Sequence, residues 1–154
     1  MAADPIESLR SLAGHARQAR DRALARLAQA QLGQRAAQAQ GEQLATYHAE
    51  YQQRWSERFT QATSPLLLQC YQGFAQRLQQ AIAHQAQTVH QAGLRQQQAH
   101  AALLQLERRL AAVDKLIERR LAELNRIGRR LDQRESDEFA ARRGTDRRPV
   151  ESHL

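Results

Sequence analysis

An apolar repeat in the second half of this chain limits what the chain can fold into. From residue 82 to residue 131, apolar side chains recur at alternating steps of three and four, which places them on one stripe of a single long helix. Twelve of the sixteen residues at the repeat positions are apolar. Such a stripe needs a second helix to cover it, so the repeat predicts a coiled coil. The positions are Ile82, Gln85, Val89, Ala92, Gln96, Ala99, Leu103, Leu106, Leu110, Val113, Ile117, Arg120, Leu124, Ile127, Leu131 and Arg134.

The partner helix is predicted in the first half of the chain. Asp4 is a suitable cap, Pro5 suits a first helical position, and Pro65 interrupts the chain and suits the start of a second helix. The first helix has a weaker, small-residue stripe, which lets two helices approach closely. Its positions are Leu9, Ala13, Ala16, Arg20, Ala23, Leu27, Ala30, Gln34, Ala37, Gly41, Leu44, His48, Tyr51 and Trp55.

We therefore expect an all-α fold, a long two-helix antiparallel coiled-coil hairpin with a longer C-terminal helix. The hairpin covers residues 1–143, with one helix over about 5–60, a turn over about 61–65 and a second helix over about 66–143. Gly144 is expected to end that helix, and residues 144–154 to form a disordered basic tail. A turn centred near residue 65 makes Gln34 face Gln96 across the seam.

The second helix is longer than the first, so its end is predicted to lack a partner within the chain. Beyond about Arg126 the apolar stripe nevertheless continues through Ile127 and Leu131, with Phe139 further on. The two interpretations left open are a seat for another protein and a frayed helix end.

Two stripes near the predicted turn share one spacing. Near this turn the chain carries more aromatic and apolar bulk than two helices normally bury, in Leu44, Tyr47, Tyr51, Trp55, Phe74 and Leu78. We expect some of this bulk in the seam and the rest in an exposed aromatic patch. The stripes are Gln40, Leu44, Tyr47 and Tyr51 on the first helix, and Phe74, Leu78, Ala81 and Gln85 on the second.

Charge and cysteine content narrow the function classes. The net charge of +7 could attract nucleic acid, anionic lipid or an acidic protein surface. Acidic residues among the C-terminal arginines weaken the nucleic-acid interpretation. Cys70 is the only cysteine, so no internal disulfide forms. With no signal peptide pattern at 1–7 and no apolar run of about 20 residues, a cytoplasmic protein is expected.

Enzyme chemistry is not expected. The seven glycines are scattered singly and build no phosphate-binding loop. His84, His90 and His100 do not combine with acids or with Cys70 at metal-ligand spacing, and Cys70 has no adjacent base. We predict no catalytic residue, no metal and no cofactor.

The C-terminal segment resembles the closing signature of the FliJ family, small coiled-coil proteins of the bacterial flagellar export apparatus. It reads RLDQRESDEFA over residues 130–140. The hairpin segment is similar to the same family in YHAEY at 47–51, in YQGF at 71–74, and in Leu78 with Ala81 and Ile82. The resemblance covers nearly the whole chain, although Gln85 departs from the family member compared, which has histidine there.

The resemblance implies a non-enzymatic stalk. Members of the family insert the end that bears the termini into the ring of the export ATPase FliI and promote its hexamer. The other end contacts the export gate protein FlhA; FliH and export chaperones are further implied partners. The implied location is the inner face of the cell membrane at the flagellar base. The implied role is protein export for flagellum assembly and motility.

The implied contact residues fall into two sets. The ATPase-binding set joins apolar residues to charged ones, of which Asp137 and Glu138 are alternatively solvated helix charges. The gate-binding set is Gln40, Leu44, Tyr47, Tyr51, Phe74, Leu78, Ala81 and Gln85. The ATPase-binding set is Leu124, Ile127, Leu131, Arg134, Asp137, Glu138 and Phe139.

Three alternatives stay open. The first is the equivalent stalk of a virulence type III secretion system, which has the same fold. The second is a basic nucleic-acid-binding coiled coil, which the resemblance makes unexpected. The third is a self-assembling dimer or filament that pairs through Ile127 and Leu131.

Overall fold

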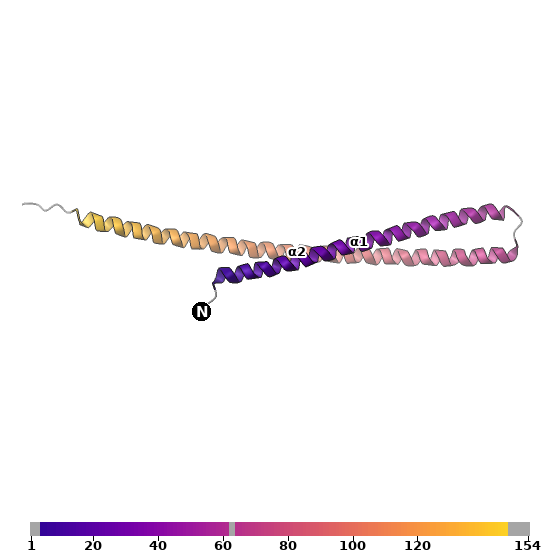
Figure 1. Cartoon of the computed structure of the whole chain (residues 1–154), viewed down its shortest axis with the longest axis horizontal. Helices are drawn as coiled ribbons and strands as arrows, with labels where there is room; N and C mark the ends of the chain where they lie inside the picture. Colours follow the sequence, from indigo (N-terminus) through magenta and orange to yellow (C-terminus); the bar gives the residue numbers. More distant parts are fainter. Residues whose placement is uncertain (1–3, 62–63, 148–154) are drawn as a thin grey trace, which may run out of the picture. The chain divides into compact units, whose positions relative to one another are not determined.

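A computed structural model describes residues 4–61 and 64–147 of the protein. These residues form two long helices. Helix α1 spans Pro5–Phe59 and helix α2 spans Pro65–Thr145. They run antiparallel and pack against each other, as Figure 1 shows, which confirms the expected all-α hairpin with a longer second helix.

Both helices begin at residues suited to capping. The Ile6 backbone N–H donates to Asp4 Oδ1 at 3.1 Å, and the Leu67 N–H donates to Ser64 Oγ at 3.3 Å. Each bond satisfies a donor that has no partner within its helix. Pro5 and Pro65, which have no N–H to satisfy, occupy the first helical positions.

Helix α2 continues through Gly144 and ends at Thr145, two residues beyond the expected stop. The Thr145 hydroxyl donates to the Arg142 carbonyl at 2.8 Å and so satisfies an acceptor of the last turn. Part of the expected turn, at 62–63, and most of the expected tail, at 148–154, lie outside the described residues.

The seam follows the two stripes that the sequence predicts. All fourteen predicted α1 positions, from Leu9 to Trp55, are buried or half-buried. The same holds for the predicted α2 positions from Ile82 to Arg120. Apart from Ile6, the most buried side chains of α1 are alanines, and apart from Ala92 those of α2 are larger aliphatic residues, so the small side chains of α1 let the two helices approach closely. The most buried residues are Ile6, Ala13, Ala23 and Ala37 on α1, and Leu78, Ala92, Leu103, Leu110 and Val113 on α2.

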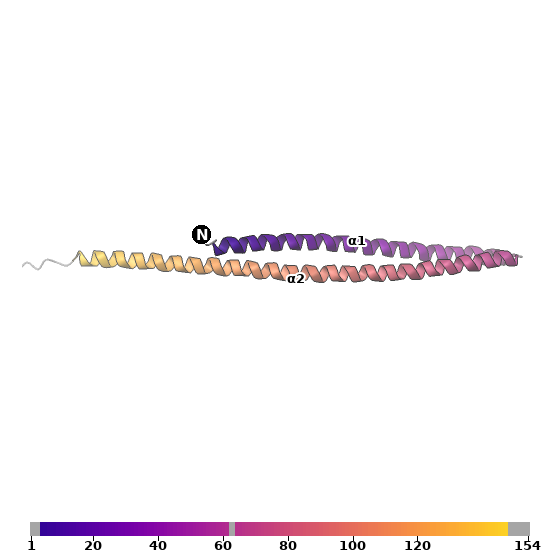
Figure 2. The same ribbon diagram turned by 90° about the horizontal axis from the view of Figure 1, so that it is seen from below.

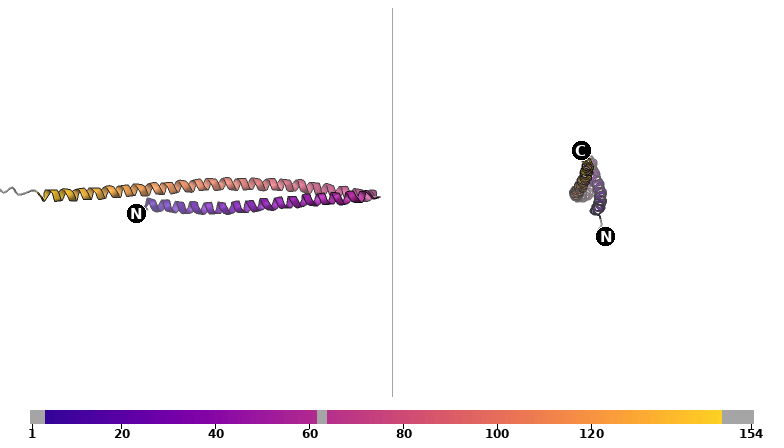
Figure 3. Two further views of the ribbon diagram at one scale, coloured as in Figure 1. Left: turned by 90° about the horizontal axis from the view of Figure 1, so that it is seen from above. Right: turned by 90° about the vertical axis from the view of Figure 1, so that its left-hand side faces the viewer.

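The chain divides into two compact units. Unit 1 contains Met1–Ala16 and Arg109–Leu154, and unit 2 contains Arg17–Arg108. In unit 2 the end of α1 and the start of α2 lie side by side up to the turn, and Figures 2 and 3 show this pairing from other directions. In unit 1, α2 extends well past the first residue of α1.

The register within unit 2 differs from the predicted one. Gln34 extends toward Gly93, since a Cβ added to this glycine would lie 3.5 Å from Gln34 Nε2. Gly93 precedes the predicted partner Gln96 by about one helical turn. Gln85 likewise reaches Ala37 and Gln40 rather than residues nearer 45. The helices end at residue 59 and begin at residue 65, so the turn is centred near 62 instead of 65. The predicted layer of Gln34 against Gln96 is therefore wrong.

Candidate interaction surfaces

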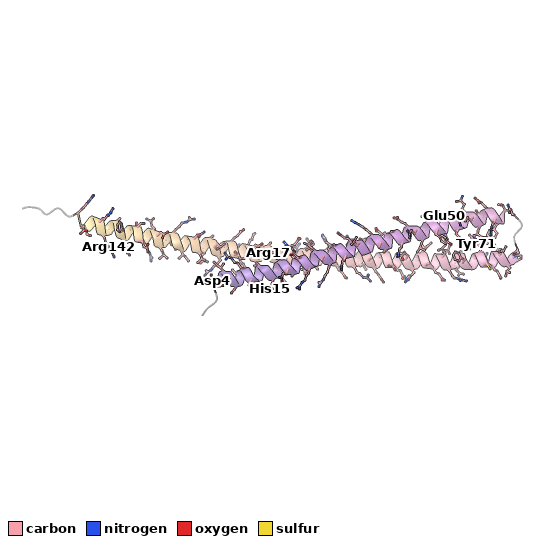
Figure 4. The ribbon with its side chains drawn as sticks, viewed as in Figure 1. Asp4, His15, Arg17, Glu50, Tyr71 and Arg142 are labelled. Carbon is pink, nitrogen blue, oxygen red and sulfur yellow. The ribbon has the colours of Figure 1, made fainter. Side chains whose placement is uncertain are left out.

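Six aromatic side chains form one cluster, the aromatic cluster, where the two helices of unit 2 approach the turn. Its members are Tyr47, Tyr51, Trp55 and Phe59 on α1, and Tyr71 and Phe74 on α2. Tyr71 of α2 lies against three rings of α1, with ring centroids 5.4 Å from Tyr51, 5.4 Å from Trp55 and 5.1 Å from Phe59. Figure 4 labels Tyr71 among the side chains near the turn. Aromatic pairs at these distances stabilise a structure beyond the area they bury. The cluster therefore stabilises the contact between the two helices near the turn.

The predicted gate-binding stripes contain both seam and surface residues. Leu78 is buried, with only 7% of its surface exposed. Tyr47 and Phe74 are 48% and 37% exposed, and their ring centroids lie 6.4 Å apart across the two helices. Of the other members, Leu44, Tyr51 and Gln85 are half-buried, and Gln40 and Ala81 are exposed. The two rings, which we call the exposed aromatic pair, are the large side chains of the stripes that face solvent.

Gln85, further from the turn, links the two helices. Its Nε2 donates to the Ala37 carbonyl at 2.8 Å and to Gln40 Oε1 at 3.4 Å. Both bonds cross from α2 to α1. A residue that departs from the family pattern thus has an evident structural role here.

Burial has an electrostatic consequence for Tyr51. Removal from water raises the pKa of its hydroxyl above the usual value of about 10, and a hydrogen bond with Trp55 partly opposes this shift. Tyr51 therefore remains neutral where an exposed tyrosine starts to ionise. Its place between Tyr71 and Phe74 supports a packing role.

The second candidate surface is the end of α2 in unit 1. From Leu121 to Thr145, which we call the overhang, every residue is exposed except Gly128, which is half-buried. The change occurs directly after Arg120, the last covered position of the stripe. Leu124, Ile127 and Leu131 continue the stripe into the overhang, and Leu131 is 55% exposed.

Charged side chains surround these apolar residues. Arg130 and Arg134 line a shallow hollow of about 370 Å³ together with Ile127 and Leu131. Arg143 stacks over the Phe139 ring at 4.8 Å, and that ring is 60% exposed. The overhang carries six arginines and five acidic residues, so it has almost no net charge. Its surface thus combines an apolar row with charges of both signs.

Asp137 is the one acidic member of the predicted ATPase-binding set with a hydrogen bond given by the structure. Gln133 Nε2 donates to its Oδ1 at 3.1 Å, between neighbouring turns of the overhang. Glu138 and Arg134 are exposed on the same segment. A helix-surface bond of this kind fits a solvated charge and leaves the second carboxylate oxygen accessible.

Sequence reasoning missed two features of the hairpin end. Phe59 belongs to the aromatic cluster, and its spacing of four from Trp55 was the available signal. Three consecutive leucines, Leu66, Leu67 and Leu68, are exposed in the first turn of α2. Their proximity to the predicted turn was the signal that could have found them.

Over residues 4–61 and 64–147, no group of His, Cys, Asp and Glu is arranged to hold a metal ion. Within the same ranges, neither helix contains a segment long and apolar enough to cross a bilayer.

Comparison with known proteins identifies a family. The family described as Flagellar FliJ protein matches residues 6–148, nearly the whole chain. No curated protein and no solved structure matches the chain. The match includes both the exposed aromatic pair and the overhang.

Proposed function

This chain belongs to the FliJ family, and on that premise we propose that it is a non-enzymatic stalk of the flagellar export apparatus. Family membership makes it a flagellar export-related protein. The finer proposal has two parts. The overhang seats in the ring of the export ATPase FliI and promotes its hexamer and activity, and the exposed aromatic pair contacts the export gate FlhA at the inner face of the membrane.

The observation that carries the proposal is the abrupt exposure of the seam stripe after Arg120. Leu124, Ile127 and Leu131 keep the seam spacing but have no covering helix within the described chain. Apolar residues arranged in a row and bordered by charges are typical of a protein-binding surface. The mixed charges of Arg134, Asp137 and Glu138 suit a partner surface with charges of both signs, and they suit a polyanion poorly.

The test of the ATPase part is hydrolysis of ATP by the cognate flagellar ATPase with and without this protein. We expect stimulation at substoichiometric amounts that survives raised salt. An I127Q/L131Q variant should lose most of it, because the apolar row is interrupted while helix propensity changes little. The matched control is L94Q/L104Q, which replaces two exposed leucines of α2 in unit 2.

Equal stimulation by the two variants and the parent protein would refute the seat on the overhang. Stimulation that collapses with salt would instead indicate binding through phosphates or other strong charges. Sedimentation of the isolated protein separates the remaining alternative, since pairing through Ile127 and Leu131 would give a dimer that I127Q/L131Q abolishes.

The gate part of the proposal rests on Tyr47 and Phe74. A Y47A/F74A variant should retain the helical content of the parent, because both side chains are largely exposed, and should bind the FlhA cytoplasmic domain at least about tenfold more weakly. L32A/L94A is the control, since both leucines are exposed and lie away from the aromatic cluster. Unchanged affinity in Y47A/F74A would remove the pair from the gate contact. A virulence-type gate protein in place of FlhA distinguishes the flagellar system from its virulence counterpart.

A further inference from the structure

The proposed function leaves three exposed leucines unexplained. Leu66, Leu67 and Leu68 occupy the first turn of α2 and are 71%, 46% and 42% exposed. None of them belongs to the seam, to the exposed aromatic pair or to the overhang. A run of exposed leucines at one end of a helix pair is unfavourable in water, so its surroundings need an explanation.

The arrangement around the helix indicates what kind of surroundings fit. Successive residues of an α-helix differ by about 100°, so the three leucines together cover about 200° of the helix circumference. A flat protein surface contacts residues three and four apart on one side of a helix. It cannot cover three consecutive residues. A fluid apolar layer that receives the helix end from several sides can cover all of them.

Most backbone N–H groups of this turn have hydrogen-bond acceptors within the protein, as an apolar layer requires. Unsatisfied N–H groups are costly in an apolar environment. Pro65 has no N–H, Leu67 donates to Ser64 Oγ at 3.3 Å, and Leu68 donates to the Ser64 carbonyl at 3.3 Å. Most of the donors at the helix start are therefore satisfied within the protein.

The charges beside the leucines favour an anionic surface. Arg54 and Arg58 line one open hollow of about 580 Å³ with Trp55, and the Arg58 guanidinium lies 5.5 Å from the Trp55 ring centroid. Glu57 is the acidic residue in that hollow. From residue 58 to residue 106 the sequence contains no aspartate or glutamate. A tryptophan flanked by arginines and followed by leucines is typical of a segment at a lipid–water interface.

We propose that the turn end of unit 2 docks on the surface of an anionic lipid bilayer. Leu66, Leu67 and Leu68 enter the boundary between headgroups and acyl chains, and Arg54 and Arg58 face the lipid phosphates. The contact is interfacial. It goes beyond the proposed export function and requires neither the ATPase nor the gate.

The chain supplies its own reporter for the test. Trp55 is the only tryptophan in the sequence, and it lies in the same cluster as Phe59, near the turn that joins the two helices. We would mix the full chain with vesicles of phosphatidylcholine alone or of phosphatidylcholine with phosphatidylglycerol. Co-sedimentation measures binding. The emission of Trp55, with brominated lipid as a quencher, reports whether this end lies at the interface.

We expect binding to the phosphatidylglycerol vesicles, a blue shift of Trp55 and quenching by brominated lipid. L66Q/L67Q/L68Q should reduce the vesicle affinity at least about tenfold, because three apolar side chains are lost from the interface. The matched control is L32Q/L94Q/L104Q, whose leucines are 63%, 45% and 39% exposed in the same unit. It should bind like the parent protein. Circular dichroism verifies that both variants fold.

Two results would overturn the proposal. One is the absence of binding to phosphatidylglycerol vesicles by the folded parent protein. If L66Q/L67Q/L68Q then loses gate binding, the leucines bind in a concave pocket of a protein partner instead. The other is an equal loss of binding in the two triple variants, which would reduce the effect to general hydrophobicity. Because the vesicles contain no protein, either result leaves the ATPase and gate proposals to their own tests.

Discussion

Replacement of Leu78 by alanine tests whether the predicted gate stripe is partly a structural seam. Leu78 is 7% exposed on α2. The change removes about three methylene equivalents, each worth about 0.8 kcal/mol when buried. Leu→Ala substitutions in closed cores cost about 2–5 kcal/mol, and a seam of two helices lets water reach part of the gap. We therefore expect the free energy of unfolding to fall by about 2–3 kcal/mol.

The assay is urea unfolding followed by circular dichroism. With a denaturant slope of about 2 kcal/mol/M, the midpoint should fall by about 1 M. The control is L94A, the same substitution on the same helix at a residue that is 45% exposed. L94A should move the free energy of unfolding by less than about 0.5 kcal/mol, because alanine is at least as good a helix former as leucine.

Equal midpoints for L78A and L94A would refute the reasoning, because burial would then not distinguish the two positions. A large loss of gate binding in L78A with an unchanged midpoint would also contradict it. In that case Leu78 would be a contact residue, and the seam near the turn would depend on the aromatic cluster alone.

Single substitutions at Gln85, Gly33 and Tyr51 give further tests in unit 2. Gln85→Ala removes the 2.8 Å bond to the Ala37 carbonyl and should lower the free energy of unfolding by about 0.5–1.5 kcal/mol in urea unfolding; Gln87→Ala, at an exposed position of α2, should be close to neutral. Gly33→Ala should raise the free energy of unfolding by about 0.5–1 kcal/mol, since a Cβ at this position meets nothing within 4 Å, and a lower melting temperature would contradict this. The raised pKa of Tyr51 means that the unfolded chain loses the Tyr51 proton first as the pH rises. Its contribution to stability is therefore complete below about pH 10 and is lost above it. Urea midpoints measured on both sides of that pH should fall less in Tyr51→Phe than in the parent, and parallel falls would exclude Tyr51 as the cause.

Periodicity was sufficient to predict the fold because, in a seam of two helices, the burial of a residue depends mainly on its position along the repeat. Each residue of a stripe is covered or exposed according to its position in the repeat, so the fourteen α1 positions and the α2 positions up to Arg120 could be read from spacing. The cap at Asp4 followed from local chemistry in the same way. The extra length of α2 followed from the positions of the turn and the first helix start.

Two features depended on the tertiary structure. The register of Gln34 and Gln85 depends on where both helices stop, because a shift in the turn centre changes the facing residue by twice as many positions. Whether Tyr47 or Leu78 is exposed depends on how the aromatic rings from both helices share a limited space.

Residue spacing and residue type alone were thus enough to predict the fold class, the stripes of the seam and the family resemblance. The structure decided which members of the stripes face water and how the three leucines beside the turn are exposed. The physical reason is that helix formation and stripe position are local properties. Exposure at the end of a helix pair is set by contacts between residues distant in the chain.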